Sequence, residues 1–314
     1  MDLLKILRSK IDILEEGEHI PGLSAVLLHI ETASRHLLRG QENDDSTAFT
    51  DAIYRTNQAF EGSLKEAYRV FAEKSPDRKN TFEIESYFER NNIFRQRVLT
   101  QFTNYRTEWR NPSIHDYKLD FDESEAFLAI VSVTAFACLM LDQICERVAY
   151  SQTKIESQPK KKEIRSQVDN FVSGDFFQRI IEIFKEFSRQ QLSFNPEEIK
   201  LSESYVAGQI MGFFASVFPE IEIEYDYKIG DIRVDFRISD GSSQILVEIK
   251  RFNKYSVIDV SQLAKYQSLT NIKLGILFQF SDTGGELRAE EMSDPLLNSK
   301  IFVLTPLPPQ PIAD

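Results

Sequence analysis

The chain has 314 residues, of which 42% are apolar and 27% charged, as in an ordinary globular protein long enough for two domains. Its net charge of −12 argues against a protein that coats nucleic acid through its overall field. Residues 201–314 carry 16 acids and 10 bases, so both parts of the chain are acidic. Any contact with nucleic acid therefore needs a local basic patch.

Membrane insertion is not expected from the apolar pattern. No apolar run reaches the roughly 18 residues of a membrane span, and the longest candidate, residues 126–141, lies inside a helical pattern. Acidic residues interrupt the N-terminal segment, which therefore lacks the layout of a signal peptide. We expect a cytoplasmic protein without a membrane partner.

The first 150 residues predict a bundle of helices. Apolar residues recur at helical spacing from Leu3 to Leu14, and Pro21-Gly22 ends this first helix. Asn111-Pro112 predicts a second clear break, because proline disfavours helix in the residue before it. The other predicted helices cover residues 23–38, 51–71, 82–91, 93–109 and 124–148.

A polar stretch separates this region from the rest of the chain. Residues 151–166 contain Pro159 and three consecutive lysines, which is typical of a linker, and residues 168–192 predict a connecting amphipathic helix. We therefore predict a helical domain over residues 1–155, a linker with a connecting helix over 156–200, and a second domain over 201–314.

The periodicity changes after residue 201, where apolar and polar residues begin to alternate as in strands. Asp240-Gly241 predicts a hairpin turn between two of these strands. The predicted order is a helix over 202–218, strands over 220–228, 232–238 and 245–249, a helix over 256–269, and strands over 274–280 and 301–304. The fold class is therefore an all-α helical bundle followed by an α/β domain with a central mixed sheet.

Three charged residues on the hairpin are the strongest candidate site. Glu248 and Lys250 lie two apart on one strand and share a face, and Asp235 lies on the polar face of the preceding strand. Two carboxylates and the backbone carbonyl of Ile249 are hard oxygen ligands of the kind that Mg²⁺ prefers. Such an ion lowers the pKa of a bound water, and a nearby lysine offsets negative charge, as phosphodiester hydrolysis requires.

These residues resemble the PD-(D/E)XK nuclease superfamily over about 110 residues. Its acid on one strand and its (D/E)-x-K on the next correspond to Val234-Asp235 and Glu248-Ile249-Lys250, with valine in place of the usual proline. The resemblance implies a restriction-endonuclease-like fold, Mg²⁺ or alternatively Mn²⁺ as cofactor, and DNA or RNA as substrate.

Two further features extend this resemblance. Some branches add Q-x-x-x-Y on the following helix, here Gln262 and Tyr266, which would contact the metal–water network and the scissile backbone. An acid on the first helix of the domain, here Glu203, would be a further metal ligand. Each has an ordinary alternative: an exposed Glu–Lys pair, a solvated first-turn acid at Glu203, and a packing role for Tyr266.

A second candidate site lies in the helical region. Arg110, Asn111 and His115 form an R-N-x3-H pattern that resembles the HEPN superfamily of helical ribonucleases. The resemblance implies a homodimer that cleaves RNA without a metal, with His115 as acid or base, Arg110 stabilising the charged phosphate and Asn111 orienting them. The alternative is a structural Arg–His pair, or a scaffold that only dimerises.

Together the two resemblances imply a two-headed nuclease similar to microbial antiviral effectors. Two alternatives remain open: one active nuclease head beside a sensing or dimerising domain, and an inactive nucleic-acid-binding regulator.

Overall fold

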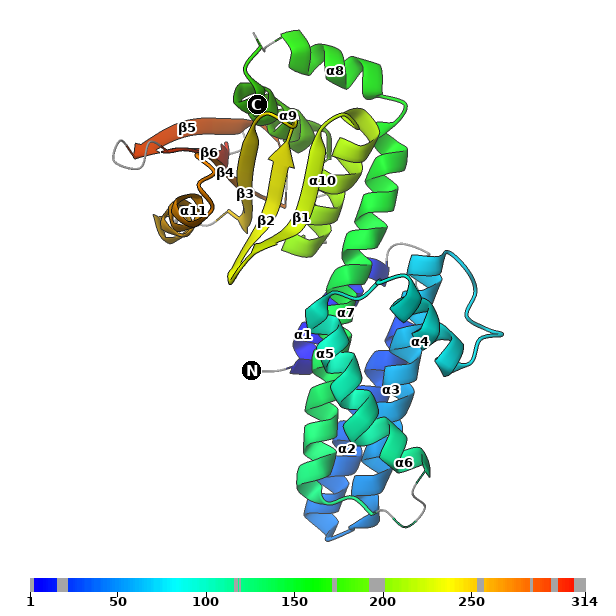
Figure 1. Cartoon of the computed structure of the whole chain (residues 1–314). Helices are drawn as coiled ribbons and strands as arrows, with labels where there is room; N and C mark the ends of the chain where they lie inside the picture. The colour runs from blue at the N-terminus through cyan, green and yellow to red at the C-terminus, as the bar shows by residue number, and fades with distance from the viewer. Residues whose placement is uncertain are drawn as a thin grey trace, which may run out of the picture. The chain divides into compact units, whose positions relative to one another are not determined.

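The computed structural model describes residues 3–15, 22–115, 118, 120–170, 174–191, 201–252, 257–282, 285–294 and 299–307. The chain divides into two compact units, Met1–Arg147 and Val148–Asp314, called the helical unit and the sheet unit below (Figure 1). The helical region is followed by a mixed six-stranded sheet with helices, which confirms the predicted fold class. The predicted domain limits at residues 155 and 200 stay predictions.

The helical unit packs around a cluster of aromatic side chains. Phe60 on α3 stacks on Tyr105 and Phe102 of α5, with ring centroids 4.7 and 5.6 Å apart, and also contacts Phe136 of α7. These rings are fully buried, so they join α3, α5 and α7 in one core. The elements are α1 (Leu3–Glu15), α2 (Leu23–Asn43), α3 (Thr47–Ala72), α4 (Thr81–Arg90), α5 (Gln96–Tyr105), η1 (Arg106–Arg110), α6 (Asn111–His115) and the first part of α7 (Glu123–Ser157).

The long helix α7 has the length and apolar composition of a membrane-spanning helix, which the sequence pattern had not predicted. Within the described residues it is the one helix whose length and composition alone would let it cross a membrane. A helix in the core of a domain can have the same length and composition, and Ala126, Val133 and Ile144 of α7 are fully buried against the protein. The expected absence of a membrane partner stays a prediction.

The stretch predicted as a polar linker is helical. α7 continues to Ser157, and α8 spans Lys161–Asn170 before α9 begins at Phe176 and ends at Gln191. Ile164 and Val168 are buried on one side of α8, which explains how so polar a segment forms a packed helix. The polar composition hid this helix in the sequence, because two apolar residues at helical spacing are enough to dock the segment.

The sheet unit has the strand order β1-β2-β3-β4-β6-β5. β3, β4 and β6 are parallel neighbours, and the pairs β1–β2, β2–β3 and β5–β6 are antiparallel. The elements are α10 (Glu203–Val217), β1 (Glu222–Ile229), β2 (Ile232–Ser239), β3 (Gln244–Arg251), α11 (Val257–Thr270), β4 (Leu274–Phe280), β5 (Leu287–Asp294) and β6 (Ser299–Pro306). Strand β5 was not expected from the sequence.

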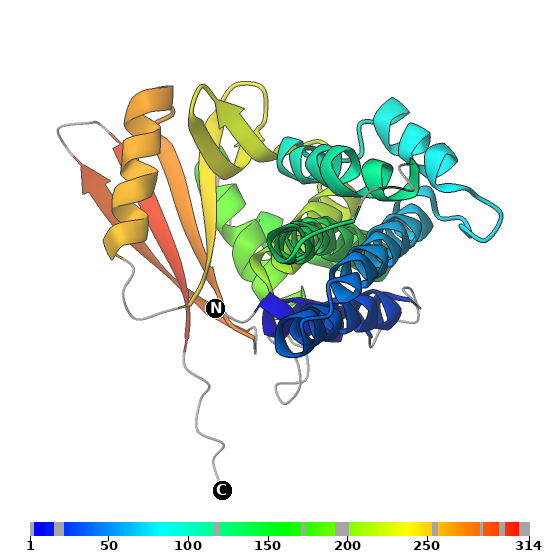
Figure 2. The same ribbon diagram turned by 90° about the horizontal axis from the view of Figure 1, so that it is seen from below.

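Helices cover both faces of the central strands (Figures 1 and 2). Leu263 of α11 packs with Leu246, Leu277 and Val303 on one face. On the other face Phe184 of α9 contacts Phe278, with ring centroids 5.1 Å apart. Burial on both faces explains the nearly continuous apolar sequence of β4.

Candidate active site

The two halves of the hairpin motif meet where β2 and β3 stop pairing. The regular register runs from Ser239↔Gln244 to Phe236↔Val247. At the next position the Asp235 carboxylate accepts a hydrogen bond from the backbone N–H of Ile249, at 2.8 Å. The side chain of Asp235 thus binds the β3 backbone beside Glu248, which fixes one acid next to the other.

Glu248 is a buried acid beside a second acid. Only 4% of Glu248 is exposed. Burial raises the pKa of the Glu248 carboxyl, and the charge of Asp235 and a hydrogen bond with it raise this pKa further. Two carboxylates this close in a poorly solvated position favour a bound cation.

Lys250 supplies positive charge at the same place. Its ammonium lies 3.4 Å from the Glu248 carboxylate and 3.9 Å from that of Glu203. Burial lowers the pKa of Lys250, but the charges of Asp235, Glu203 and Glu248 outweigh burial and raise it overall. Lys250 is therefore a stable cation among three acids.

Glu203 reaches the site from the first turn of α10. The helix starts there because the Ser202 hydroxyl caps it, accepting a hydrogen bond from the Tyr205 N–H at 3.1 Å. The Glu203 side chain is about half exposed, at 51%. Burial raises its pKa, while the Lys250 charge opposes that change. Glu203 thus faces Lys250 from the open side of the site.

Gln262 and Tyr266 lie on α11 and bind each other. The Gln262 amide donates to the Tyr266 hydroxyl at 2.5 Å, as expected for residues one helical turn apart. Tyr266 packs beside the buried cluster around Leu263. Over the part of the chain that the structure describes, no hydrogen bond or ion pair joins either residue to Asp235, Glu248 or Lys250, so their contact with the site stays a prediction.

The donor set at Asp235 and Glu248 fits a small divalent cation. The described ranges contain no group of three or more His, Cys, Asp or Glu side chains arranged to hold a metal. Mg²⁺ does not need one, because proteins hold it with one or two carboxylates and leave its other positions to water and substrate phosphate. Asp235, Glu248 and the Ile249 carbonyl have the right chemistry for it.

One polar residue beside the site was not expected from the sequence. Gln279 on β4 lies in register with Lys250 on β3, so both side chains point to the same face. It is the only polar residue in the apolar strand LGILFQF, and that exception is the signal that would have identified it.

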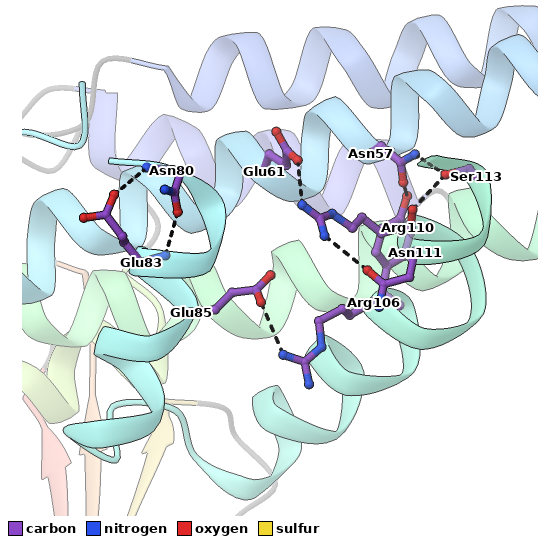
Figure 3. A network of polar contacts seen from close by, with 10 residues as sticks. Asn57, Glu61, Asn80, Glu83, Glu85, Arg106, Arg110, Asn111 and Ser113 are labelled. Atoms are coloured by element: carbon purple, nitrogen blue, oxygen red, sulfur yellow. Dashed lines mark hydrogen bonds and ion pairs between the residues drawn. The ribbon is translucent and has the colours of Figure 1, made fainter. Parts of the chain in front are cut away.

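The Arg110 motif lies in the helical unit, on a helix with an unusual turn (Figure 3). The guanidinium donates to the Asn111 side chain at 3.1 Å and lies 3.5 Å from Glu61. Ser113 accepts a hydrogen bond from Asn57 at 2.6 Å and donates to the Arg110 carbonyl at 3.0 Å. Arg110 and Asn111 thus come together, whereas the side chain of His115 lies outside the described residues.

The predicted break at Asn111-Pro112 is absent. Asn111 has helical angles, and α5, η1 and α6 follow one another without a gap. The turn before Pro112 is π-helical, and the Asn111 N–H bonds to the Arg106 carbonyl five residues back. A wider turn accommodates a proline that has no N–H to donate and a ring that crowds the preceding turn. Arg110 is the last residue of η1, and Asn111–His115 form the short helix α6 before the long helix α7.

Comparison with known proteins bears on the sheet unit. Residues 212–290 match the family model of the PD-(D/E)XK nuclease superfamily. No curated protein and no solved structure matches the chain. The matched segment contains Asp235, Glu248, Lys250 and the pair on α11, and it begins after Glu203. The match supports a nuclease, a hydrolase with a nucleic-acid substrate.

Proposed function

We propose that the sheet unit hydrolyses phosphodiester bonds at Asp235, Glu248 and Lys250 with the help of a divalent metal. The observation that carries this proposal is the placement of Asp235 against the β3 backbone, next to a buried Glu248 and the Lys250 ammonium. The family match over residues 212–290 supports the same reaction class.

The residues divide the chemistry between them. Asp235, Glu248 and the Ile249 carbonyl would hold Mg²⁺ or Mn²⁺, with Glu203 as an outer carboxylate. When bound, the metal supplies an activated water and polarises the phosphoryl oxygen. The Lys250 ammonium orients the attacking water and offsets the negative charge that develops on the phosphate. Gln262 and Tyr266 hold the strand around the scissile bond.

A cleavage assay on the full chain tests this proposal. Wild-type protein is incubated with RNA or DNA, with Mg²⁺ and with EDTA. Glu248→Gln removes one carboxylate at constant size and abolishes Mg²⁺-dependent cleavage, and Lys250→Ala lowers it by about 10²–10³-fold, the usual effect of one electrostatic donor. Glu222→Gln, an exposed acid on β1, is the matched control and retains full activity. Mg²⁺-dependent cleavage that survives Glu248→Gln contradicts the metal site.

A second, metal-independent ribonuclease site is our candidate for the Arg110 motif. The Nε of Arg110 is buried and has no partner among the described groups, which leaves a donor for a phosphate. The π-helical turn supports a functional role, since such turns are frequent at functional sites. In this proposal His115 is the acid or base, Arg110 stabilises the phosphate, and two chains pair to complete the cleft.

The test for the second site is EDTA-resistant cleavage of RNA. His115→Ala abolishes it, while Glu248→Gln leaves it unchanged. If wild-type protein shows no EDTA-resistant cleavage, the helical unit serves dimerisation or sensing instead. A role in antiviral defence stays a prediction that rests on the resemblance alone.

A further inference from the structure

Polar side chains form a row across the sheet, starting at Lys250. The register aligns Lys250 on β3 with Gln279 on β4, and Arg288 on β5 with Thr305 on β6. Extending the β4–β6 register by one residue from Phe278↔Leu304 aligns Gln279 with Thr305. The Thr305 hydroxyl confirms this by donating to the Gln279 side-chain oxygen at 3.0 Å. Paired residues share a face, so the row continues the face that carries Glu248 and Lys250.

This row lies at the carboxyl ends of the parallel strands. Lys250, Gln279 and Thr305 are each one residue from the end of their strand. Open α/β sheets bind their ligands outside these ends. On the same face α11 packs against Leu246, Leu277 and Val303, which lie further back along the strands. The row at the strand ends is therefore where a substrate that reaches Lys250 would continue across the sheet.

The Gln279 amide is an unsatisfied donor inside this row. Gln279 is only 2% exposed, and its oxygen accepts from Thr305. Across the described ranges its amide nitrogen donates to no group of the protein. The amide nitrogen is therefore available to donate to an acceptor on a ligand that lies along the row.

Arg288 is the sheet arginine with the weakest internal pairing. It is 67% exposed, and its carboxylate partner Glu290, at 3.4 Å, is itself 56% exposed. An exposed pair of this kind contributes little and is easily exchanged for another anion. The other arginines of the described strands are held by carboxylates: Arg233 by Asp226, Arg237 by Glu224, and Arg251 by Asp282.

We propose that Gln279 and Arg288 bind successive phosphates on one side of the scissile one, so that the substrate is a polynucleotide strand lying across β3, β4, β6 and β5. This inference rests on the proposed nuclease activity. Three strand spacings of about 4.8 Å separate Lys250 from Arg288, or about 14 Å. With phosphates about 3.4 Å apart along the axis of a stacked strand, the row spans roughly four nucleotides.

The negative net charge of the chain makes the affinity for nucleic acid depend on these donors. Because the chain is acidic overall, its long-range field does not attract nucleic acid. Local donors must supply the affinity, and Arg288 contributes a full charge at the far end of the row. A mononucleotide would reach Lys250 but not Arg288, so chain length sets the affinity.

Binding measured in EDTA tests this inference without cleavage. The probe is a fluorescently labelled single-stranded oligonucleotide, with a labelled mononucleotide as the short comparison, titrated over a range of salt concentrations. Arg288→Ala weakens oligonucleotide binding by about three- to tenfold, the effect of one charge-assisted contact. It also makes the salt slope shallower by about 0.7, the contribution of one phosphate in a single strand. Mononucleotide binding does not change.

Lys300→Ala is the matched control. Lys300 is 56% exposed and pairs with Glu291 at 3.3 Å, but it lies at the opposite, amino end of β6. Its removal leaves both affinity and salt slope unchanged. Gln279→Met keeps the side-chain size, and it weakens oligonucleotide binding without changing the salt slope. Thermal melting checks that the Gln279→Met protein folds. If it does not fold, the binding of Arg288→Ala alone tests the inference.

Failure of this inference differs from failure of the proposed function. If wild-type protein cleaves with Mg²⁺ but Arg288→Ala binds oligonucleotide with the wild-type affinity and salt slope, the strand does not follow the row and only this inference falls. If wild-type protein neither binds nor cleaves any nucleic acid, both fall.

Discussion

Asp235 has two tasks at the residue scale, and substitutions can separate them. It accepts a hydrogen bond from the Ile249 backbone and supplies a charge to the site. Asp235→Asn keeps an acceptor and removes the charge, so we expect unfolding free energy close to wild type and complete loss of Mg²⁺-dependent cleavage. Asp235→Ala also removes the acceptor and costs about 1–3 kcal/mol of stability, because a backbone donor is left unsatisfied. Denaturant unfolding with parallel cleavage assays checks both, and equal instability in the two variants contradicts the assignment.

The site residues that the sequence identified are those brought together by neighbouring segments of the chain. Asp235, Glu248 and Lys250 come together through strand alternation and one short turn, both of which are legible in the sequence. Gln279 was missed because its place beside Lys250 depends on parallel pairing between β3 and β4 across the intervening helix. Nothing in local periodicity fixes the register of such a crossover.

At the scale of elements, α11 ties two strands of the sheet together. The buried Gln267 amide donates to the carbonyls of Lys273 and Lys300, at 2.9 and 3.1 Å, just before β4 and early in β6. Gln267→Leu would remove two buried hydrogen bonds and cost about 1–3 kcal/mol of unfolding free energy, since the Lys273 carbonyl still accepts from the Lys300 N–H. Denaturant unfolding measures this loss, and a change below about 0.5 kcal/mol, the size of an ordinary surface substitution, would show that the clamp is dispensable.

A substitution in the Gln262–Tyr266 pair on the same helix distinguishes a packing role of Tyr266 from a role in catalysis. Tyr266→Phe keeps the ring against the Leu263 cluster and loses the hydroxyl that Gln262 binds. The proposed substrate contact predicts a fall in cleavage with stability within about 1 kcal/mol of wild type. Unchanged cleavage would leave Tyr266 a packing residue, the ordinary alternative.

Helices and strands were predictable where their apolar pattern is strong. Their prediction failed where packing overrides that pattern. The strand Leu274–Phe280 was predicted to the residue from its apolar run. β5 was missed because its sequence LRAEEMSD is charged, as suits an edge strand. The helical stretch through Pro112 was missed because sequence rules give proline as a break and cannot foresee a π-helical turn.

On the scale of the whole molecule, the two units are predicted to act independently. Both single variants, His115→Ala in the helical unit and Glu248→Gln in the sheet unit, leave the other activity intact. The predicted homodimer is measured by light scattering of the full chain. A monomeric chain with EDTA-resistant RNA cleavage would contradict the paired cleft proposed for the helical unit.

The most direct measurement is a crystal structure of the Lys250→Ala protein with Mn²⁺ and an oligonucleotide, in which the ion is located by anomalous scattering. We predict one ion bound by the Asp235 and Glu248 carboxylates and the Ile249 carbonyl, in contact with a phosphate of the strand. A structure in which the strand is bound while the two carboxylates hold no ion, or in which the ion lies elsewhere, would contradict the account.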